Sequence, residues 1–210
     1  MLKIKICGLS RVEDIQIANE LLPDYIGFVF ANSKRQVSPK QAGELKKLLR
    51  PEIKAVGVFV NSPLEQVVAL AQDGVIDMVQ LHGDEDAAYC QQLRQKIKVP
   101  VIKAIRLRDE AVLENLDCFP CDYLLFDTYV TGQYGGSGKL GRLSLLNGRK
   151  FNKPYFLAGG MTAQNVQEAL QGVDAYAVDV SGGVETDGVK DAKKVATFIQ
   201  AVRGRSEEDE

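Results

Sequence analysis

The chain has 210 residues, of which 45% are hydrophobic and 26% are charged, and its formal net charge at pH 7 is −2. This length and apolar content suit one domain with a sizeable core. Because the charge is nearly balanced and no block of Lys or Arg is present, nucleic acid and anionic membrane surfaces are not expected partners. No apolar run is long enough to cross a bilayer. Four cysteines without a signal-peptide pattern indicate reduced thiols in a cytoplasmic protein.

Short β-rich runs alternate with longer amphipathic segments along the chain. We expect strands at 3–7, 25–29, 54–60, 78–82, 101–105, 123–127, 154–158 and 175–180. We expect helices at 11–21, 39–49, 63–72, 86–96, 109–115, 162–170 and 190–202. Ser10, Ser38 and Ser62 each stand three residues before Glu or Gln, which is the pattern of a capping box, and proline follows the last two at the expected first helical position.

Eight such strand units predict an α/β fold, a single (β/α)8 TIM barrel with a parallel eight-stranded core. We expect this barrel domain to span 1–204 and the acidic C-terminal tail at 205–210 to be disordered. A doubly wound open sheet is the structural alternative, but no GxGxxG follows the first expected strand.

Polar side chains fall on one face of four expected strands, since side chains alternate between the two faces. The face turned into the barrel then carries Lys3, Lys5 and Cys7; Met78, Gln80 and His82; Tyr123, Leu125 and Asp127; and Ala175, Ala177 and Asp179. The opposite face, turned toward the helices, carries Val79, Leu81, Leu124, Phe126, Tyr176 and Val178. Cys7, His82, Asp127 and Asp179 all stand near the C-terminal end of a strand, the active-site face of such a barrel. A lone thiol is usually a small buried hydrophobe, so it is their convergence that favours catalysis.

Paired glycines follow the last two expected strands. They are Gly159 and Gly160 in "LAGGM" 157–161, and Gly182 and Gly183, after Ser181, in "DVSGGVE" 179–185. Loops at these two places form the usual phosphate site of a TIM barrel, and glycine lets backbone N–H groups approach an anion. We therefore expect a backbone cradle for phosphate, with Thr162 capping the helix that follows the first turn. A third stretch, "YGGSGK" 134–139, lacks the P-loop spacing and is interpreted as a loop that closes over the ligand.

Neither a metal site nor a redox dithiol is predicted. "CFPC" 118–121 has no second cysteine pair and the chain has one histidine, which is too few ligands for zinc. The motif also precedes a strand, whereas a reactive dithiol usually begins a helix. "GDED" 83–86 is interpreted as the acidic first turn of a helix.

The order and spacing of these motifs resemble the phosphoribosylanthranilate isomerase family across nearly the whole chain. The matching stretches are "KICG" 5–8, "FANSKRQVSP" 30–39, "GVFVN" 57–61, "VQLHGDE" 79–85, "DYLLFDT" 122–128, "GGSG" 135–138, "LAGGM" 157–161, "DVSGGVE" 179–185 and "GVKD" 188–191. The resemblance implies a (β/α)8 barrel without cofactor or metal. It would carry out the Amadori rearrangement of a small phosphorylated substrate, N-(5-phosphoribosyl)anthranilate, to 1-(2-carboxyphenylamino)-1-deoxyribulose 5-phosphate in tryptophan biosynthesis.

The same resemblance implies site residues. Cys7 matches the general base and Asp127 the general acid, Arg35 matches the arginine that contacts the anthranilate carboxylate, and His82 and Asp179 match positions that hold the substrate. Two departures from the family pattern stand out: "KLGRL" 139–143 replaces an aromatic, an acid or amide and a tryptophan, and Gly182 replaces a serine.

The chemistry of this reaction suits those residues. A neutral carboxylic acid can protonate the ribose ring oxygen and a thiolate can remove the C2′ proton. We therefore expect the pKa of Cys7 to be shifted toward thiolate and that of Asp127 to be shifted toward the neutral acid. Lys5, two residues before Cys7 on the same face, either contributes to the shift at Cys7 or is paired within the barrel.

Two other functions are weighed against this one. A non-catalytic sugar-phosphate-binding barrel has no use for an acid–base pair. A barrel like indole-glycerol-phosphate synthase needs a lysine acid among glutamates at the mouth, which Lys103 and Arg106 do not supply. The sequence leaves monomer and homodimer open.

Overall fold

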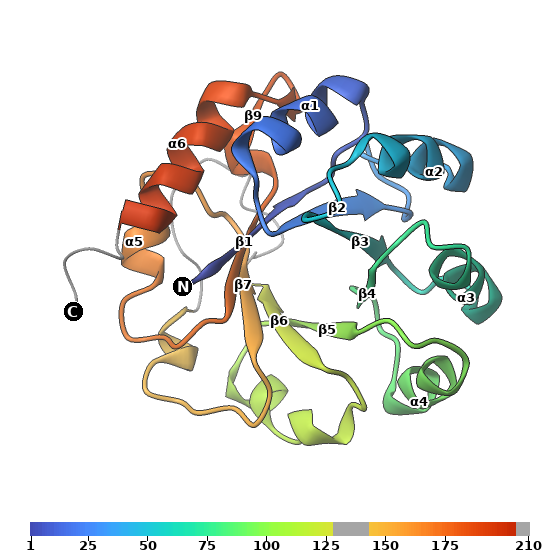
Figure 1. The fold of residues 1–210 in the computed structure, drawn as a ribbon. Coiled ribbons are helices and arrows are strands. Elements are labelled where there is room, and N and C mark those ends of the chain that lie inside the picture. Colours follow the sequence, from blue (N-terminus) through green and yellow to red (C-terminus); the bar gives the residue numbers. More distant parts are fainter. Residues whose placement is uncertain (128–142, 205–210) are drawn as a thin grey trace.

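The computed structural model describes residues 1–127 and 143–204, and eight parallel strands in it close into a barrel (Figure 1). The strands are β1 (Lys3–Cys7), β2 (Tyr25–Val29), β3 (Lys54–Phe59), β4 (Met78–Leu81), β5 (Val101–Arg106), β6 (Tyr123–Asp127), β7 (Tyr155–Ala158) and β8 (Ala177–Val180). Each strand pairs with the next in the chain, and β8 pairs with β1. The predicted (β/α)8 barrel is confirmed, and the open-sheet alternative is excluded because the sheet closes on itself.

Helices surround the barrel in Figure 1. They are α1 (Val12–Leu21), α2 (Pro39–Leu48), α3 (Leu64–Gln72), α4 (Ala87–Lys96), the single turn α5 (Val166–Ala169) and α6 (Ala192–Arg203). The described residues also form the short 3₁₀ turns η1 (Glu110–Leu113), η2 (Leu116–Cys118), η3 (Leu143–Leu146) and η4 (Gly182–Val184), of which η4 follows β8. A two-stranded ribbon, β9 (Glu185–Thr186) and β10 (Val189–Lys190), leads into α6. None of the described helices is long and apolar enough to span a membrane.

The helix predicted at 109–115 is absent, and η1 and η2 stand in its place. Asp109 caps the first turn by accepting a hydrogen bond from the N–H of Val112. The backbone then leaves the helical region, since Glu114 is extended and Asn115 is left-handed with φ 58°. The sequence correctly indicated an N-cap at this place. The helical backbone ends at Leu113, so no α-helix extends to Asn115.

The predicted serine caps are correct at only one of three helices. The Ser38 hydroxyl caps α2, with proline at its first position. Ahead of α1, the Asp14 carboxylate accepts from the backbone N–H groups of Ser10 and Arg11, so the helix begins one residue later than a Ser10 cap would place it. Ahead of α3, Pro63 occupies the cap position instead of the serine before it.

The two faces of the strands divide the core as the alternation predicts. An inner cluster fills the barrel with Tyr25, Val56, Met78, Ile102, Ala104, Leu125, Phe156, Ala158 and Ala177. The predicted outward residues Val79, Leu81, Leu124, Phe126 and Val178 pack in the layer between strands and helices. Lys3, at the opposite end of the barrel from the mouth, pairs with Asp24 at 2.8 Å.

The prediction for residues 175 and 176 is wrong. Because β8 begins only at Ala177, strand alternation does not extend to them. Ala175 packs on the outer layer and Tyr176 on the inner cluster. The Tyr176 ring lies 5.6 Å from that of Phe156, and its hydroxyl lies 2.7 Å from the Tyr25 hydroxyl. These aromatic rings therefore fill the N-terminal end of the barrel.

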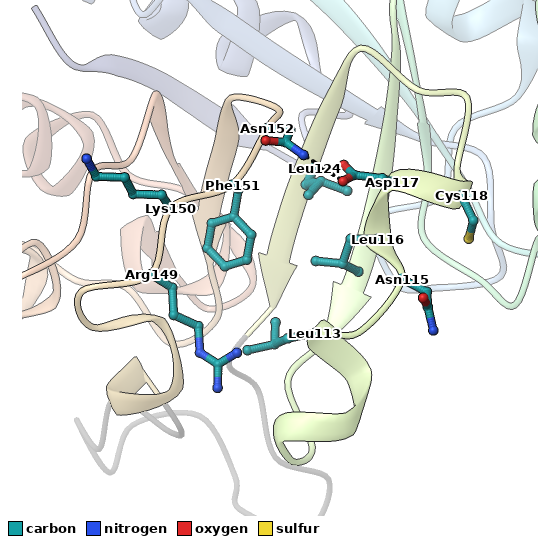
Figure 2. Close-up of a pocket in the computed structure, with 10 residues that line it drawn as sticks. All are labelled: Leu113, Asn115, Leu116, Asp117, Cys118, Leu124, Arg149, Lys150, Phe151 and Asn152. Carbon is teal, nitrogen blue, oxygen red and sulfur yellow. Dashed lines mark hydrogen bonds between the residues drawn. The ribbon is translucent and has the colours of Figure 1, made fainter.

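A cavity of 460 Å³ opens on the outer side of β6, beside the turns that replace the predicted helix (Figure 2). In Figure 2 Phe151 lies across the cavity from Leu116, and Asn152 donates a hydrogen bond to Asp117 at 2.6 Å. The lining residues are Leu113, Asn115, Leu116, Asp117, Cys118, Leu124, Arg149, Lys150, Phe151 and Asn152. Since Leu124 faces away from the barrel interior, this cavity is separate from the polar residues at the strand ends.

Candidate active site

The C-terminal ends of β1, β4, β6 and β8 bring the four predicted polar residues to one mouth. His82 Nε2 lies 3.1 Å from Asp127 Oδ2. Burial raises the pKa of Asp179 and the charge of Asp127 adds to that rise, while the charge of Asp179 in turn raises the pKa of Cys7. The predicted convergence of a thiol, an imidazole and two carboxylates is therefore present in the fold.

Lys5 and Asp179 form an ion pair inside the barrel. They are direct partners in the β1–β8 register, and Lys5 Nζ lies 2.9 Å from Asp179 Oδ2. The two side chains are 0% and 7% exposed. Burial by itself would lower the pKa of Lys5, but the charge of Asp179 beside it holds that pKa above its ordinary value. Asp179 Oδ1 is buried and has no hydrogen-bond partner among the described residues, so it can accept from a ligand.

The Cys7 thiol sits in a space that glycine provides. A Cβ on Gly27, the neighbour of Cys7 on β2, would lie 2.7 Å from the sulfur. Burial raises the pKa of Cys7, and the charges of Lys5 and Lys190 offset this only in part. The expected shift toward thiolate is wrong for this structure, because loss of hydration outweighs two nearby ammonium groups.

His82 is held from both sides of its ring. Gln80 Nε2 lies 2.8 Å from Nδ1, and Asp127 Oδ2 lies on the Nε2 side. Its backbone oxygen also accepts from the Arg106 guanidinium at 3.0 Å. Gln80 and His82 project inward two residues apart, as the alternation predicts, but the contact of His82 with Asp127 depends on the barrel closing and was not visible in the sequence.

Glu85 ties together the loops around His82. One carboxylate oxygen accepts from the N–H of Asn61 at 2.7 Å, and the other from the N–H of Gly83 at 2.9 Å and from Lys103 Nζ at 3.1 Å. The Glu85 and Lys103 side chains are 2% and 4% exposed. The prediction that "GDED" is the acidic first turn of a helix is wrong, because α4 begins at Ala87 with Asp86 as its N-cap, leaving Glu85 to a buried ion pair. The sequence of a short acidic run before a helix does not show that Glu85 pairs with Lys103.

Arg35 reaches the mouth already paired. Its Nε and one terminal nitrogen donate to the two oxygens of Glu185 at 2.6 and 2.7 Å. Lys190 Nζ donates to the same carboxylate at 2.7 Å and to the backbone oxygen of Ser181 at 3.1 Å. Burial would raise the pKa of Glu185, but Arg35 and Lys190 hold it below its ordinary value. Glu185 and Lys190 lie in motifs that the sequence matched without assigning them a role.

The two glycine turns pack against each other. A Cβ on Gly183 would lie 1.9 Å from the backbone oxygen of Met161, so the turns meet backbone to backbone. Gly159 and Gly160 have φ of 97° and 63°, which a side chain would strain. Gly182 differs, because a Cβ there meets only Arg35 at 3.5 Å, an ordinary contact. The Ser181 hydroxyl donates to the backbone oxygen of Cys7 at 2.9 Å, which joins this turn to β1.

Thr162 is not the predicted helix cap. Its backbone N–H donates to Asn165 Oδ1 at 2.8 Å, and the Asn165 amide donates to the backbone oxygen of Gly160 at 2.9 Å. The following helix begins only at Val166 and has four residues. The loop "YGGSGK" 134–139 and the departure at 139–142 lie outside the described residues.

The described residues give no sign of a reactive dithiol at "CFPC" 118–121 or of a metal site. All four cysteines are free thiols, Cys118 exposed and Cys121 buried. Burial raises the pKa of Cys121, which is the opposite of an activated dithiol. In the described ranges, 1–127 and 143–204, no group of three or more His, Cys, Asp or Glu residues is placed to hold a metal ion.

Comparison with known proteins gives consistent relatives over nearly the whole chain. The model of the family described as N-(5'phosphoribosyl)anthranilate (PRA) isomerase matches residues 4–201. The N-(5'-phosphoribosyl)anthranilate isomerase of Thermoanaerobacter pseudethanolicus is 50% identical over 204 residues, covering 97% of this chain and 99% of that protein. The crystal structure of phosphoribosyl anthranilate isomerase from Thermotoga maritima has a TM-score of 0.87 at 34% identity, covering 97% of this chain and 100% of that chain.

A second solved structure carries a ligand. It is a phosphoribosyl anthranilate isomerase in complex with reduced 1-(o-carboxyphenylamino)-1-deoxyribulose 5-phosphate. Its TM-score is 0.79 at 33% identity, with 97% of this chain and 100% of that chain covered.

Proposed function

This chain belongs to the N-(5'-phosphoribosyl)anthranilate isomerase family, and from that premise we propose that it performs the Amadori rearrangement with Asp127 as general acid and Cys7 as general base. The enzyme is an isomerase of tryptophan biosynthesis. The observation that carries the proposal is the placing of a carboxyl group and a thiol at one barrel mouth, next to two glycine turns that meet backbone to backbone.

Asp127 acts first in this mechanism. Its carboxyl proton passes to the ribose ring oxygen, the C1′–O bond breaks, and the nitrogen lone pair forms a C1′=N iminium. The mouth is suited to this step because Asp127 Oδ2 is anchored by the His82 ring, which limits the rotation of the acid. The sequence resemblance gave His82 the role of holding the substrate. In this proposal it instead holds the acid Asp127 in place.

Cys7 acts second. Its thiolate takes the proton from C2′, and the C–H electron pair forms the C1′=C2′ double bond while the iminium nitrogen becomes neutral. The resulting enolamine then tautomerises to the ketone. Burial raises the pKa of the thiol in the free protein, so the thiolate forms beside the iminium cation, whose charge adds to those of Lys5 and Lys190 and lowers the pKa.

The remaining polar groups fit the substrate's other functions. Asp179 Oδ1, buried and without a partner among the described residues, accepts from a ribose hydroxyl. Arg35 takes the anthranilate carboxylate, and since Glu185 occupies the Nε edge of its guanidinium, the substrate binds at the other edge or replaces Glu185. A planar guanidinium has five N–H donors, so in either arrangement Arg35 has enough donors to bind the substrate carboxylate.

The phosphate is held by backbone N–H groups of Gly159, Gly160, Gly182 and Gly183, with the Ser181 segment linking them to β1. The left-handed backbone of the first turn and the close contact at Gly183 support this placement. Lys190 donates to the Ser181 backbone oxygen and so stabilises the second turn. A cation therefore lies near the phosphate site, although neither glycine turn contains one.

The two alternatives fit the geometry less well. A barrel that only binds a sugar phosphate would not need Cys7 and Asp127 at the same mouth. A synthase-like barrel needs a lysine acid inside the mouth, whereas Lys103 lies over the Phe119 ring and pairs with Glu85 outside the barrel interior.

The experiment that tests the function is complementation of an auxotroph lacking only this pathway step, followed by assay of the purified protein. We expect growth without tryptophan from the wild-type gene and none from Asp127→Asn. Growth from the variant at the wild-type rate, with equal protein levels, would remove Asp127 from the mechanism. The cytoplasmic location, the absence of a cofactor, the choice between monomer and homodimer, and the domain limits 1–204 and 205–210 stay predictions.

A further inference from the structure

Gln80 is a buried amide that the mechanism above does not use. It lies on β4 with its side chain inside the barrel and is 1% exposed. Its Nε2 lies 2.8 Å from Nδ1 of His82, while its Oε1 has no hydrogen-bond partner among the described residues. One end of the amide is therefore committed to the imidazole, at the cost of an unsatisfied oxygen at the other end.

The contact decides which ring nitrogen of His82 carries the proton. An amide nitrogen is only a donor, so the nitrogen that faces it must be the acceptor. In the neutral imidazole the proton then sits on Nε2, and this is the nitrogen 3.1 Å from Asp127 Oδ2. With this tautomer the contacts run in one direction, from the Gln80 amide as donor to His82, and from His82 Nε2–H as donor to Asp127.

We propose that Gln80 is a positioning residue that fixes the Nε2–H tautomer of His82 and thereby orients the acid Asp127. Because Oδ2 of Asp127 accepts from the imidazole, the proton of the neutral acid belongs on Oδ1, the oxygen that delivers it to the substrate. The assignment of Asp127 as the acid rests on the proposed function, whereas the tautomer of His82 does not.

The opposite tautomer would work against catalysis. With the proton on Nδ1, the lone pair of Nε2 would face Asp127 and accept its carboxyl proton in a hydrogen bond. The acid proton would then be held between carboxyl and imidazole instead of being directed to the ring oxygen. Selecting the tautomer of a histidine beside a catalytic group is a known way in which a buried residue affects rate without touching substrate.

The chain contains one histidine, so its tautomer can be measured directly. Protein labelled with ¹⁵N-histidine gives one pair of ring nitrogen signals, whose two-bond correlations to the ring protons assign each nitrogen. At a pH near 8.5, about two units above the pKa of an ordinary imidazole, we expect a pyrrole-type signal from Nε2 and a pyridine-type signal from Nδ1. The reverse assignment in the wild-type protein would overturn the proposal.

Two variants sharpen the test. Gln80→Met keeps the length of the side chain but removes the donor, so both ring signals should move toward the average of the two tautomers, and kcat should fall by about ten- to a hundredfold with KM nearly unchanged. Met78→Leu, two residues earlier on the same inward face of β4, is the control and should alter neither the signals nor kcat. Unchanged ring signals in folded Gln80→Met would refute the role of Gln80.

The outcomes separate this proposal from the function. An Nε2–H tautomer that persists in Gln80→Met, in an enzyme that needs Asp127, leaves the isomerase mechanism standing and removes Gln80. A tautomer that changes as expected, in a protein whose Asp127→Asn variant keeps full turnover, supports the contact but removes the acid it was proposed to orient.

Discussion

Replacement of Lys5 by methionine tests how much the ion pair inside the barrel contributes to the free energy of unfolding. Lys5 is 0% exposed and forms an ion pair with Asp179 Oδ2, while Asp179 Oδ1 has no hydrogen-bond partner among the described residues. Lys5→Met therefore leaves a buried carboxylate without its ammonium. Breaking such a pair on one side typically costs about 3–5 kcal/mol of unfolding free energy. For a chain of this size each kcal/mol lowers Tm by about 2–4 °C, so the expected fall is about 6–20 °C at pH 8.

The loss should depend on pH with a definite sign. Burial raises the pKa of Asp179, and without Lys5 nothing beside it opposes that rise as strongly. The folded variant then holds a proton that the unfolded chain releases near pH 3.9. Stability relative to wild type should accordingly be preserved below about pH 4, fall as pH rises toward the raised pKa, and level off above it.

The assay is thermal unfolding of Lys5→Met and of Lys5→Met/Asp179→Leu between pH 4 and pH 8, followed by circular dichroism. The double variant removes the carboxylate as well and should recover most of the lost stability, because a buried ion pair can be replaced by apolar groups at little cost. A single variant within 2 °C of wild type at pH 8, or a double variant no more stable than the single one, would refute the reasoning.

Three further predictions, covering four substitutions, rest on the same geometry. Asp127→Asn should lower kcat/KM by about 10²–10⁴-fold, because an amide has no carboxyl proton to donate; a loss below tenfold would remove it as the acid. Gly183→Ala should weaken inhibition by inorganic phosphate and lower Tm, since its Cβ would lie 1.9 Å from a backbone oxygen, whereas Gly182→Ser, with its nearest atom at 3.5 Å, should leave both unchanged; equal effects from the two variants would contradict this. Glu85→Gln should cost about 3–5 kcal/mol in urea unfolding because Lys103 is left as a buried, unpaired cation; a change below 1 kcal/mol would show that the loops are held in another way.

The strand interior is where the sequence predicted the structure best. Period-two alternation placed Cys7, Gln80, Asp127 and Asp179 on the inner face, and that follows from strand geometry alone once a strand is correctly located. It failed at Tyr176, because the strand began later than the apolar run indicated and the aromatic ring turned into the end of the barrel. Strand limits depend on pairing with neighbours, which a local pattern does not contain.

The ion pairs between distant residues could not be predicted from the sequence for the same reason. Glu185 with Arg35 joins residues 150 positions apart, and Asp179 with Lys5 joins residues 174 apart. The sequence places Lys5 and Asp179 on the inner face and singles out Arg35, but it does not pair them. Only the closure of β8 on β1 makes the members of each pair neighbours. The direction of the Cys7 pKa also depends on burial, which outweighs the nearby lysines that the sequence made visible.

In the proposed mechanism Cys7 removes a substrate proton, while backbone groups elsewhere at the mouth hold the phosphate. The most direct measurement is kcat of purified Cys7→Ala with N-(5-phosphoribosyl)anthranilate, taken together with the inhibition constant of inorganic phosphate. We expect a loss in kcat of about 10²–10⁴-fold or more, with phosphate inhibition nearly unchanged. A folded Cys7→Ala protein that turns over at the wild-type rate would contradict it.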